Sequence, residues 1–317
     1  MASIFVTGAT GVIGGRVLPH LTAAGHVVTA IGRSPEKRAS IERAGARPVE
    51  VDLFDELRVR DAVAGHEAIV NLATHIPKSS RMFLPGAWRE NDRIRREGSR
   101  NLVDAAIAVG AERFVQESFA PMYADAGERW IDERSRLEPA RYNRSTIDAE
   151  ISADRATQAG LEGVVLRFGM FYGPDSTQLR DMIRIVRNGW SPLPGPPEAF
   201  VSPVSHDDAA AAVVAALGVP AGVYNVTDDE PIRRREFVDV LALAVGVPEP
   251  RFAPAWLARL GGSLGELLSR SLRISNRKLR EASGWAPAWP SIREGLPAAV
   301  SAMPTPADAI REGRDRR

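Results

Sequence analysis

The chain has 317 residues, of which 44% are hydrophobic and none is cysteine, and its 41 Lys and Arg residues balance 40 Asp and Glu residues. This length is enough to bury a large core. The charge balance gives no reason to expect nucleic acid or an anionic membrane as a partner, and the missing cysteines exclude disulfides, thiolate zinc sites and cysteine nucleophiles. A core strand begins almost at once with no visible export signal, so we expect a cytoplasmic protein.

The first predicted strand, Ile4–Val6, leads into a glycine-rich turn that begins at Thr7, and a helix is predicted from Val12 to about Ala24. Glycine is needed where a strand turns sharply into a helix and where the backbone approaches a pyrophosphate closely. The helix N-terminus then receives the phosphate charge. The pattern predicts a dinucleotide-binding loop rather than an ordinary tight turn, with cofactor contacts from Gly8, Thr10, Gly11, Val12, Ile13 and Gly14.

The second predicted strand, Val27–Ile31, is followed by Gly32-Arg33-Ser34. An NAD enzyme usually places an acidic side chain here, on the adenosine ribose. In this sequence the acid is missing, and Arg33 can hold a 2′-phosphate in a bidentate, charge-assisted pair with Ser34 as an added donor. We therefore expect NADP(H) in preference to NAD(H); the alternative is that Arg33 is a solvated surface charge.

Four further apolar runs, 48–51, 68–72, 114–116 and 164–167, alternate with helical segments such as 101–110. This alternation predicts an α/β fold with a Rossmann-type, doubly wound parallel sheet. After Gly173 the pattern loosens into a proline-rich connection and helices around 234–245 and 254–269. We expect a dinucleotide-binding domain over 1–173, a smaller substrate-binding lobe over 174–304 that is interleaved with the sheet, and a flexible tail over 305–317.

Several motifs occur in chain order after the glycine loop: Val51-Asp52-Leu53, Asn71-Leu72-Ala73, 142–150, 166–167 with 172–174, 205–208, 224–226, and 284–285 with 294–296. Together they resemble the extended branch of the short-chain dehydrogenase/reductase superfamily, which includes NAD-dependent epimerases, dehydratases and reductases. The resemblance implies that Asp52 binds the adenine, that Leu53 packs against it, and that Leu72, Ala73 and Thr74 line the cofactor path. The alternative for Asp52 is a cap or turn residue.

The redox chemistry of this family uses a tyrosine that exchanges a proton with the substrate oxygen, a lysine four residues later, and a serine or threonine that fixes the oxygen. The resemblance assigns the tyrosine to Tyr142, but Thr146 stands in the lysine position and cannot supply a positive charge. Phe119 stands in the hydroxyl position. Ser118 is one residue early, so it reaches the substrate only if the strand bulges there.

Arg95 stands three residues before Gly98, where the family pattern has an asparagine. In the fold this position approaches that of the missing lysine. Two interpretations remain open: the guanidinium assists Tyr142 or the nicotinamide ribose, or Arg95 belongs to a solvated face formed by 93–96.

A phenol without help from a lysine has a pKa of about 10, so it can donate a proton but is a poor base. This favours reduction of a carbonyl group, with Tyr142 as the acid. The segment 198–204, just before Ser205, has no cationic residue to bind the diphosphate of a nucleotide sugar. An apolar set at the expected pocket favours a small or medium, fairly apolar substrate instead: Phe119, Met122, Tyr123, Trp130, Met170, Phe171 and Trp190, with His75 at the mouth.

Two other functions remain open, a sensor or scaffold that binds NADP(H) without turnover and an epimerase, isomerase or dehydratase of the same fold. His206 is expected to pack and hydrogen-bond at a helix start, and the isolated histidines predict no metal site. The resemblance suggests a homodimer formed through the helices around 101–109 and 143–159.

Overall fold

The computed structural model describes residues 1–77, 81–82, 84, 86–140, 143–254 and 262–303. Its centre is a seven-stranded sheet in the order β11-β7-β5-β4-β1-β2-β3, in which every neighbouring pair is parallel. The strands are β1 (Ser3–Thr7), β2 (Val27–Ile31), β3 (Arg47–Val49), β4 (Ala68–Asn71), β5 (Arg113–Phe119), β7 (Glu162–Phe168) and β11 (Gly222–Val226). The doubly wound parallel sheet predicted from the sequence is confirmed.

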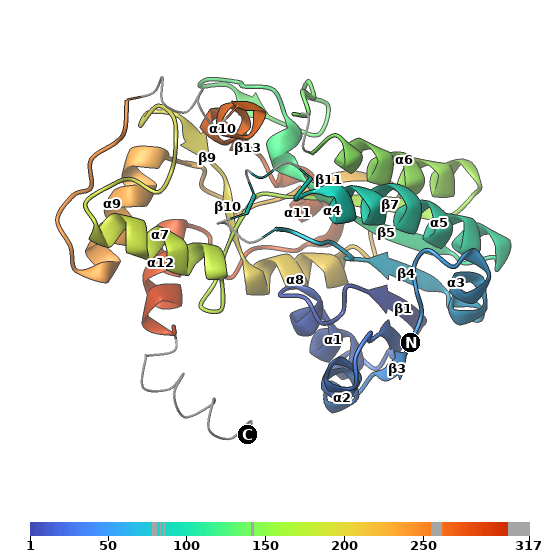
Figure 1. Ribbon diagram of the computed structural model, residues 1–317. Coiled ribbons are helices and arrows are strands. Elements are labelled where there is room, and N and C mark those ends of the chain that lie inside the picture. The colour runs from blue at the N-terminus through green and yellow to red at the C-terminus, as the bar shows by residue number, and fades with distance from the viewer. Residues whose placement is uncertain (78–80, 83, 85, 141–142, 255–261, 304–317) are drawn as a thin grey trace.

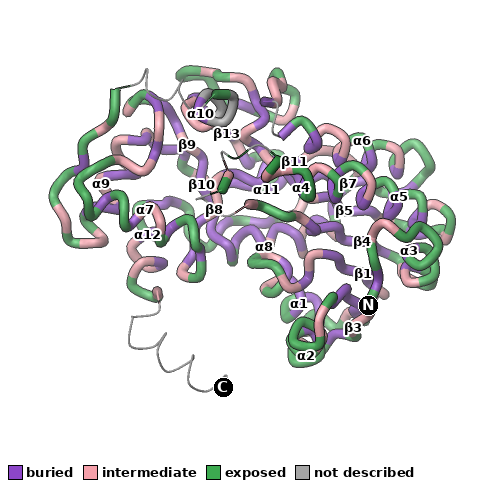
Figure 2. Tube along the Cα trace, viewed as in Figure 1, coloured by how far each residue is buried: buried purple, intermediate pink, exposed green. Residues whose placement is uncertain are grey.

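Helices cover both faces of the sheet (Figure 1). One face packs against α3 (Glu56–Val63), α5 (Ser99–Ala108) and α6 (Ser145–Gln158). The other packs against α1 (Gly14–Ala23), α2 (Pro35–Arg43), α8 (His206–Ala215) and α11 (Arg277–Ser283). Strands buried on both faces are apolar almost throughout: in β1, Phe5 enters one core while Ile4 and Val6 enter the other. Figure 2 shows the buried strands between helices whose outer sides are exposed.

A continuous helical segment connects β4 to β5. It consists of α4 (Arg89–Arg93), the π-helix η1 (Ile94–Gly98) and α5, and the residues at both junctions keep right-handed helical angles. The apolar pattern predicted only the α5 part of this segment. Short π-helical segments inside α-helices are rare and are frequent at functional sites, and η1 contains the buried Arg95.

A second lobe lies beside the carboxyl ends of the strands, on the left of Figure 1. Its core is formed by α7 (Thr177–Arg187), α9 (Arg234–Val245) and α12 (Ile292–Ser301), with Leu179, Phe237 and Leu296 among the buried residues. The remaining helices are α10 (Gly262–Ser269) and the short 3-10 turn η2 (Ala120–Met122). Three two-stranded sheets complete it: β8 (Met170–Tyr172) with β10 (Pro203–Ser205), β9 (Phe200–Val201) with β12 (Ile232–Arg233), and β6 (Trp130–Ile131) with β13 (Arg273–Ile274).

The second half of the chain also contributes to the sheet, because β11 pairs with β7 from Gly222 opposite Val164 to Val226 opposite Phe168. The expected tail over 305–317 lies outside the described residues. Within the described residues, none of the helices has the length and apolar character needed to cross a membrane.

Candidate active site

The glycine-rich turn between β1 and α1 brings the backbone against the end of β4. Gly8 has a φ of +69°, and a Cβ atom added there would lie 2.2 Å from the carbonyl oxygen of Leu72. A Cβ atom on Gly14 would lie 2.2 Å from the carbonyl oxygen of Gly8. The following helix α1 starts without a side-chain cap and has no acidic residue in its first turn. Its first N–H groups are therefore suited to an anion such as a pyrophosphate.

The other predicted loop residues lie at the surface of this turn. Gly11 and Val12 are exposed, Thr10 and Ile13 are half-buried, and the N–H of Gly11 donates to the carbonyl oxygen of Gly8 at 2.9 Å. The backbone of the turn is thus tightly folded, while its outer side remains accessible to a ligand.

The carboxyl end of β2 presents Arg33 to solvent. Ser34 is the N-cap of α2, and its Oγ accepts a hydrogen bond from the N–H of Lys37 at 3.4 Å. Lys37, the next cation along, is exposed, and Arg38 is paired with Glu50 at 2.6 Å. Arg33 and Lys37 are therefore the exposed cations here that can meet a phosphate, and Ser34 is already partly engaged as a cap.

Asp52 follows β3 and is exposed. Its Oδ1 accepts a hydrogen bond from the N–H of Phe54 at 3.0 Å, which is the turn role that the sequence left open. The cap of α3 is Asp55 instead, whose Oδ1 accepts from the N–H of Arg58. The carbonyl oxygen of Leu53 accepts from Asn101 Nδ2 at 2.9 Å, which ties this turn to α5. Contact of Asp52 and Leu53 with adenine stays a prediction.

A buried polar network supports the end of β4, where the cofactor path is expected. Asn71 Oδ1 accepts from Thr7 Oγ1 at 2.6 Å, and its Nδ2 donates to Gln116 at 2.9 Å and to Ser99 at 3.0 Å. After this fixed point the chain emerges gradually: Leu72 and Ala73 are buried, Thr74 is half-buried and His75 is exposed. The N–H of His75 donates to Asn91 Oδ1 at 2.9 Å, so the exit of the chain is also held.

Ser118 does not meet the condition that its catalytic role requires. The register of β5 against β7 is regular from Arg113 opposite Glu162 to Phe119 opposite Phe168, so the strand has no bulge. Because side chains alternate along a strand, Ser118 faces α6, where it is 1% exposed and its Oγ donates to Glu150 Oε1 at 2.5 Å. Phe119, in the family's hydroxyl position, is half-buried and carries no polar group.

Glu150 and Arg167 form a buried ion pair behind Ser118. Arg167 donates to Glu150 from Nε at 2.8 Å and from Nη2 at 2.7 Å, and from Nη1 to the hydroxyl of Tyr123 at 2.8 Å. Burial raises the pKa of the Tyr123 phenol to about 12, so this hydroxyl stays protonated and donates to Asn225 Oδ1. The arrangement fastens the carboxyl ends of β5, β7 and β11 to α6.

Arg95 is buried, with 3% exposure, and the interpretation that it belongs to a solvated face is wrong. It lies in η1, and its Nη1 donates to Thr146 Oγ1 at 2.7 Å while its Nη2 donates to Glu117 Oε1 at 2.5 Å. Thr146 is fully buried. The guanidinium thus lies beside the position where the family has its lysine. Glu117 was missed by the sequence analysis; an acid near the end of an otherwise apolar strand was the signal that could have drawn attention to it.

Tyr142, the predicted proton donor, lies outside the described residues. Helix α6 begins at Ser145, so Thr146 stands in its first turn.

The predicted apolar pocket residues do not share one environment. Met122 is fully buried and Trp190 is 50% exposed. Met170 and Phe171 in β8 are half-buried, and the Phe171 ring lies 5.3 Å from that of Phe168. Trp190 follows α7, and its backbone forms an isolated parallel β-bridge with Arg251. It lines a shallow groove together with Val247 and Pro248. Of the predicted set, Met122 is therefore a core residue, whereas Phe119, Met170 and Phe171 remain partly accessible.

The buried arginines of the second lobe are occupied by backbone carbonyls. Arg234 donates to the carbonyl oxygens of Pro194 and Ser269 from Nη1 and to that of Arg270 from Nη2, at 2.5 to 2.8 Å. Arg270 in turn donates to the carbonyl oxygens of Tyr123 and Glu138. Burial lowers the pKa of Arg234 to about 10. The Nη atoms of these two arginines thus hold the lobe together, whereas Arg234 Nε is buried and has no hydrogen-bond partner among the described residues.

His206 is the first residue of α8 and is 4% exposed, and its Nδ1 lies 2.9 Å from Asp175 Oδ1. The expected packing and hydrogen-bonding role at a helix start is confirmed. Burial lowers the pKa of His206, so it is neutral at pH 7. Asp175 also pairs with Arg16 of α1 at 2.9 Å, which links the helix after the glycine loop to the second lobe. No group of three or more possible metal ligands occurs among the residues that the structure describes.

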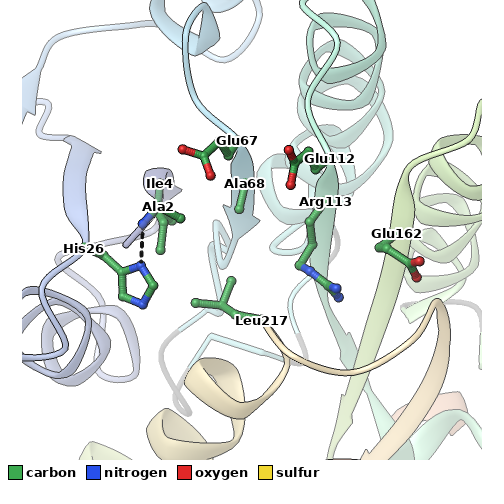
Figure 3. Close-up of a pocket in the computed structure, with 9 residues that line it drawn as sticks. All are labelled: Ala2, Ile4, His26, Glu67, Ala68, Glu112, Arg113, Glu162 and Leu217. Carbon is green, nitrogen blue, oxygen red and sulfur yellow. Dashed lines mark hydrogen bonds between the residues drawn. The ribbon is translucent and has the colours of Figure 1, made fainter.

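A separate pocket opens at the amino ends of the strands (Figure 3). Glu67, Glu112 and Glu162 line it just before or at the start of β4, β5 and β7, together with His26 and Arg113. Arg113 Nη1 donates to the carbonyl oxygens of Ala216 and Val219, and His26 Nδ1 accepts from the N–H of Ala2. In parallel sheets of this type, ligands bind at the carboxyl ends of the strands, so this pocket is not the site of the chemistry.

Comparison with known proteins agrees with the cofactor site. Residues 8–220 match the profile of a family described as NAD(P)H-binding. A 3-diazoavenalumate denitrifying reductase from a Streptomyces species is 35% identical over 305 residues, which cover 92% of this chain and 98% of that protein. A 4-hydroxy-2-methyl-3-oxo-4-farnesyl-3,4-dihydroquinoline-1-oxide ketoreductase from Stigmatella aurantiaca is 28% identical over 283 residues, covering 84% of this chain and 81% of that protein.

Solved structures agree with the fold. A dTDP-glucose 4,6-dehydratase from Streptomyces venezuelae, with NAD bound, superposes with a TM-score of 0.76 and 22% identity over 95% of this chain and 96% of that chain. A UDP-glucose 4-epimerase from Thermotoga maritima superposes with a TM-score of 0.75 and 21% identity over 95% and 98%. At this identity the likeness concerns the fold.

Proposed function

This chain belongs to the NAD(P)H-binding family of extended short-chain dehydrogenases/reductases, and we propose that it is an NADPH-dependent reductase of a small or medium, fairly apolar substrate. The observation that carries the proposal is that a buried threonine, Thr146, stands where the family has its lysine. There is no ammonium group at that position, and the nearby Arg95 guanidinium is paired with Glu117, so the phenol of Tyr142 is a weak base but a competent acid. The site is therefore suited to reduction, in which a proton is given, more than to oxidation or epimerisation.

In the proposed reaction, the nicotinamide supplies a hydride to a carbonyl carbon and Tyr142 gives a proton to the oxygen. The glycine loop and the N-terminus of α1 would bind the pyrophosphate, and Arg33 would bind the 2′-phosphate. The half-buried side chains of Phe119, Met170 and Phe171 would supply an apolar wall. The engagement of Arg234 and Arg270 with backbone carbonyls argues against a nucleotide sugar, whose diphosphate needs free cations.

A diazo compound is a second candidate substrate, favoured by the 35% identity to a denitrifying reductase of a diazo compound. An arenediazonium ion accepts a hydride at its terminal nitrogen, which oxidises NADPH to NADP⁺ and gives an aryldiazene. Loss of N2 then moves the N–H proton to the ring carbon and leaves the arene. This sequence needs no proton donor for a developing oxyanion, which fits a site where Phe119 and Thr146 replace the family's hydroxyl and lysine.

The test begins with titration of the purified protein by NADPH and NADH, followed by absorbance at the reduced-nicotinamide band with ketones, aldehydes and an arenediazonium salt. We expect tighter binding of NADPH and oxidation of the cofactor by at least one compound. Tight binding without turnover across the panel would point to the sensor or scaffold. Interconversion of nucleotide sugars would overturn the assignment as a reductase.

Tyr142→Phe separates the two substrate classes. For a carbonyl substrate, removal of the proton donor should lower turnover by roughly 10²-fold. For a diazonium substrate, turnover should stay close to that of the wild type. Full carbonyl reduction by the variant would overturn the role proposed for Tyr142.

A further inference from the structure

Two buried ion pairs lie at the carboxyl end of β5, and they differ in how completely their polar atoms are used. In the Arg167–Glu150 pair, both glutamate oxygens accept from Arg167 and every guanidinium nitrogen donates to a protein atom. In the Arg95–Glu117 pair, the arginine side chain is 4% exposed and the glutamate side chain 13% exposed. Here Arg95 Nε and Glu117 Oε2 are buried and have no hydrogen-bond partner among the described residues.

This difference argues against a purely structural role for the second pair. Burying two charges costs desolvation energy that their attraction repays only when the remaining polar atoms are also satisfied. A buried donor or acceptor that lacks a partner costs about 1–3 kcal/mol. The Arg95–Glu117 pair leaves one of each, so its geometry is unfavourable for stability alone, whereas the neighbouring Arg167–Glu150 pair shows that this part of the fold can satisfy such a pair fully.

The two unpartnered atoms are chemically complementary to a hydroxyl group. A hydroxyl hydrogen can be donated to Glu117 Oε2 while the hydroxyl oxygen accepts from the N–H of Arg95 Nε. Both contacts would involve an ionised group, so each would be stronger than a neutral hydrogen bond.

The place of the pair in the fold indicates which hydroxyl this is. Arg95 bonds to Thr146, the residue in the lysine position, and Glu117 lies next to Ser118 at the carboxyl end of β5. Arg95 is buried and lies in the π-helical turn η1, a type of segment that is frequent at functional sites. The nicotinamide half of a dinucleotide carries its hydroxyl groups on a ribose.

We propose that Arg95 and Glu117 together position the nicotinamide ribose by binding one of its hydroxyl groups between Arg95 Nε and Glu117 Oε2. This rests on the proposed function, in that it requires a nicotinamide dinucleotide. Both residues act on the position of the cofactor and not on the reacting atoms.

The experiment compares two ligands that share the adenosine half. NADPH carries the nicotinamide ribose, and adenosine 2′,5′-bisphosphate does not. Dissociation constants for both are measured by titration of the full-length protein, and their ratio isolates the nicotinamide half. The variants are Glu117→Gln and the double variant Arg95→Met/Glu117→Leu. The double variant removes both charges together, so it leaves no buried charge unpaired and is expected to fold.

Both variants should weaken the binding of NADPH by about tenfold or more and leave the affinity for the bisphosphate unchanged within twofold. The reason is that charge-assisted hydrogen bonds are lost only on the nicotinamide side. The matched control is Arg167→Met/Glu150→Leu, which should lower the melting temperature but keep the ratio. An unchanged ratio in the folded double variant would overturn the proposal; if that variant does not fold, Glu117→Gln decides in the same way.

The outcome is separable from that of the proposed function. If the wild type binds NADH better, NADH and ADP replace the two ligands and the ratio is read as before. Binding with the expected ratios but no turnover on any substrate would leave the positioning pair supported and the reductase assignment overturned. A wild type that binds no dinucleotide would overturn both.

Discussion

Replacement of Asp228 by asparagine should stabilise the protein at neutral and alkaline pH. Asp228 follows β11 and is 1% exposed, and neither of its carboxyl oxygens has a hydrogen-bond partner among the described residues. Burial, reinforced by the nearby charge of Asp208, raises the pKa of this carboxyl group to about 9. Asparagine has nearly the same shape and carries no proton that can be lost.

The direction of the effect follows from the two pKa values. In the unfolded chain the carboxyl group has a pKa of about 3.9. Between that value and pH 9 the folded state holds one proton more than the unfolded state. The folding equilibrium constant of the wild type, divided by that of the variant, is therefore highest below pH 4. This ratio falls by about tenfold per pH unit as the pH rises toward 9. Above pH 9 the difference stops growing.

Urea denaturation of the wild type and Asp228→Asn at pH 6, 7 and 8 measures this difference, because all other titrations occur in both proteins and cancel. Asp229→Asn is the matched control: that acid pairs with Arg280 at 2.9 Å, so its loss should destabilise the protein without a growing dependence on pH. A stability difference between the wild type and Asp228→Asn that is constant from pH 6 to 8 would mean that Asp228 is ionised in the folded protein, and the reasoning would fail.

Three further changes address the site. Arg33→Asp should shift the ratio of NADPH to NADH affinity by about tenfold or more toward NADH, because a charge-assisted contact is replaced by repulsion; an unchanged ratio would remove Arg33 from the 2′-phosphate site. Thr146→Lys should lower the melting temperature, because its ammonium would be buried beside the Arg95 guanidinium, and adding Arg95→Asn should restore it; stabilisation by Thr146→Lys alone would contradict this. Gly14→Ala should weaken NADPH binding in a titration, since its Cβ would lie 2.2 Å from the carbonyl oxygen of Gly8; wild-type affinity would show that the loop does not need this close approach.

Local sequence was enough to predict the first half of the fold. The strand, glycine turn and helix around Gly8 are contiguous, and the apolar runs that became β2, β4, β5 and β7 were predicted within a few residues. The strand β11 was different. Its residues appeared as a motif, but its place beside β7 depends on a chain that leaves the sheet, builds part of the second lobe and returns. No local pattern encodes that return.

The site was harder to predict because it depends on which face a side chain occupies. The run Arg93-Ile94-Arg95-Arg96 has the composition of a solvated face, and nothing in the sequence indicated a π-helical turn. The π-helical turn η1 changes the angular position of its residues, and Arg95 becomes buried against Thr146 and Glu117. For Ser118 the regular structure decides the face instead. The register of β5 with β7 has no bulge, and the alternation of side chains along β5 therefore turns Ser118 toward α6.

The position of β11 also affects how this protein is made. When residues 1–173 have been synthesised, every strand of the central sheet except β11 is present, and β7 is then an open edge with unpaired backbone groups and the apolar side chains of Val164, Leu166 and Phe168. The edge is closed only after Val226 has emerged, so a nascent chain must keep this strand from pairing with other chains while the intervening segment is added. We therefore expect a fragment that ends at residue 173 to aggregate through this open edge.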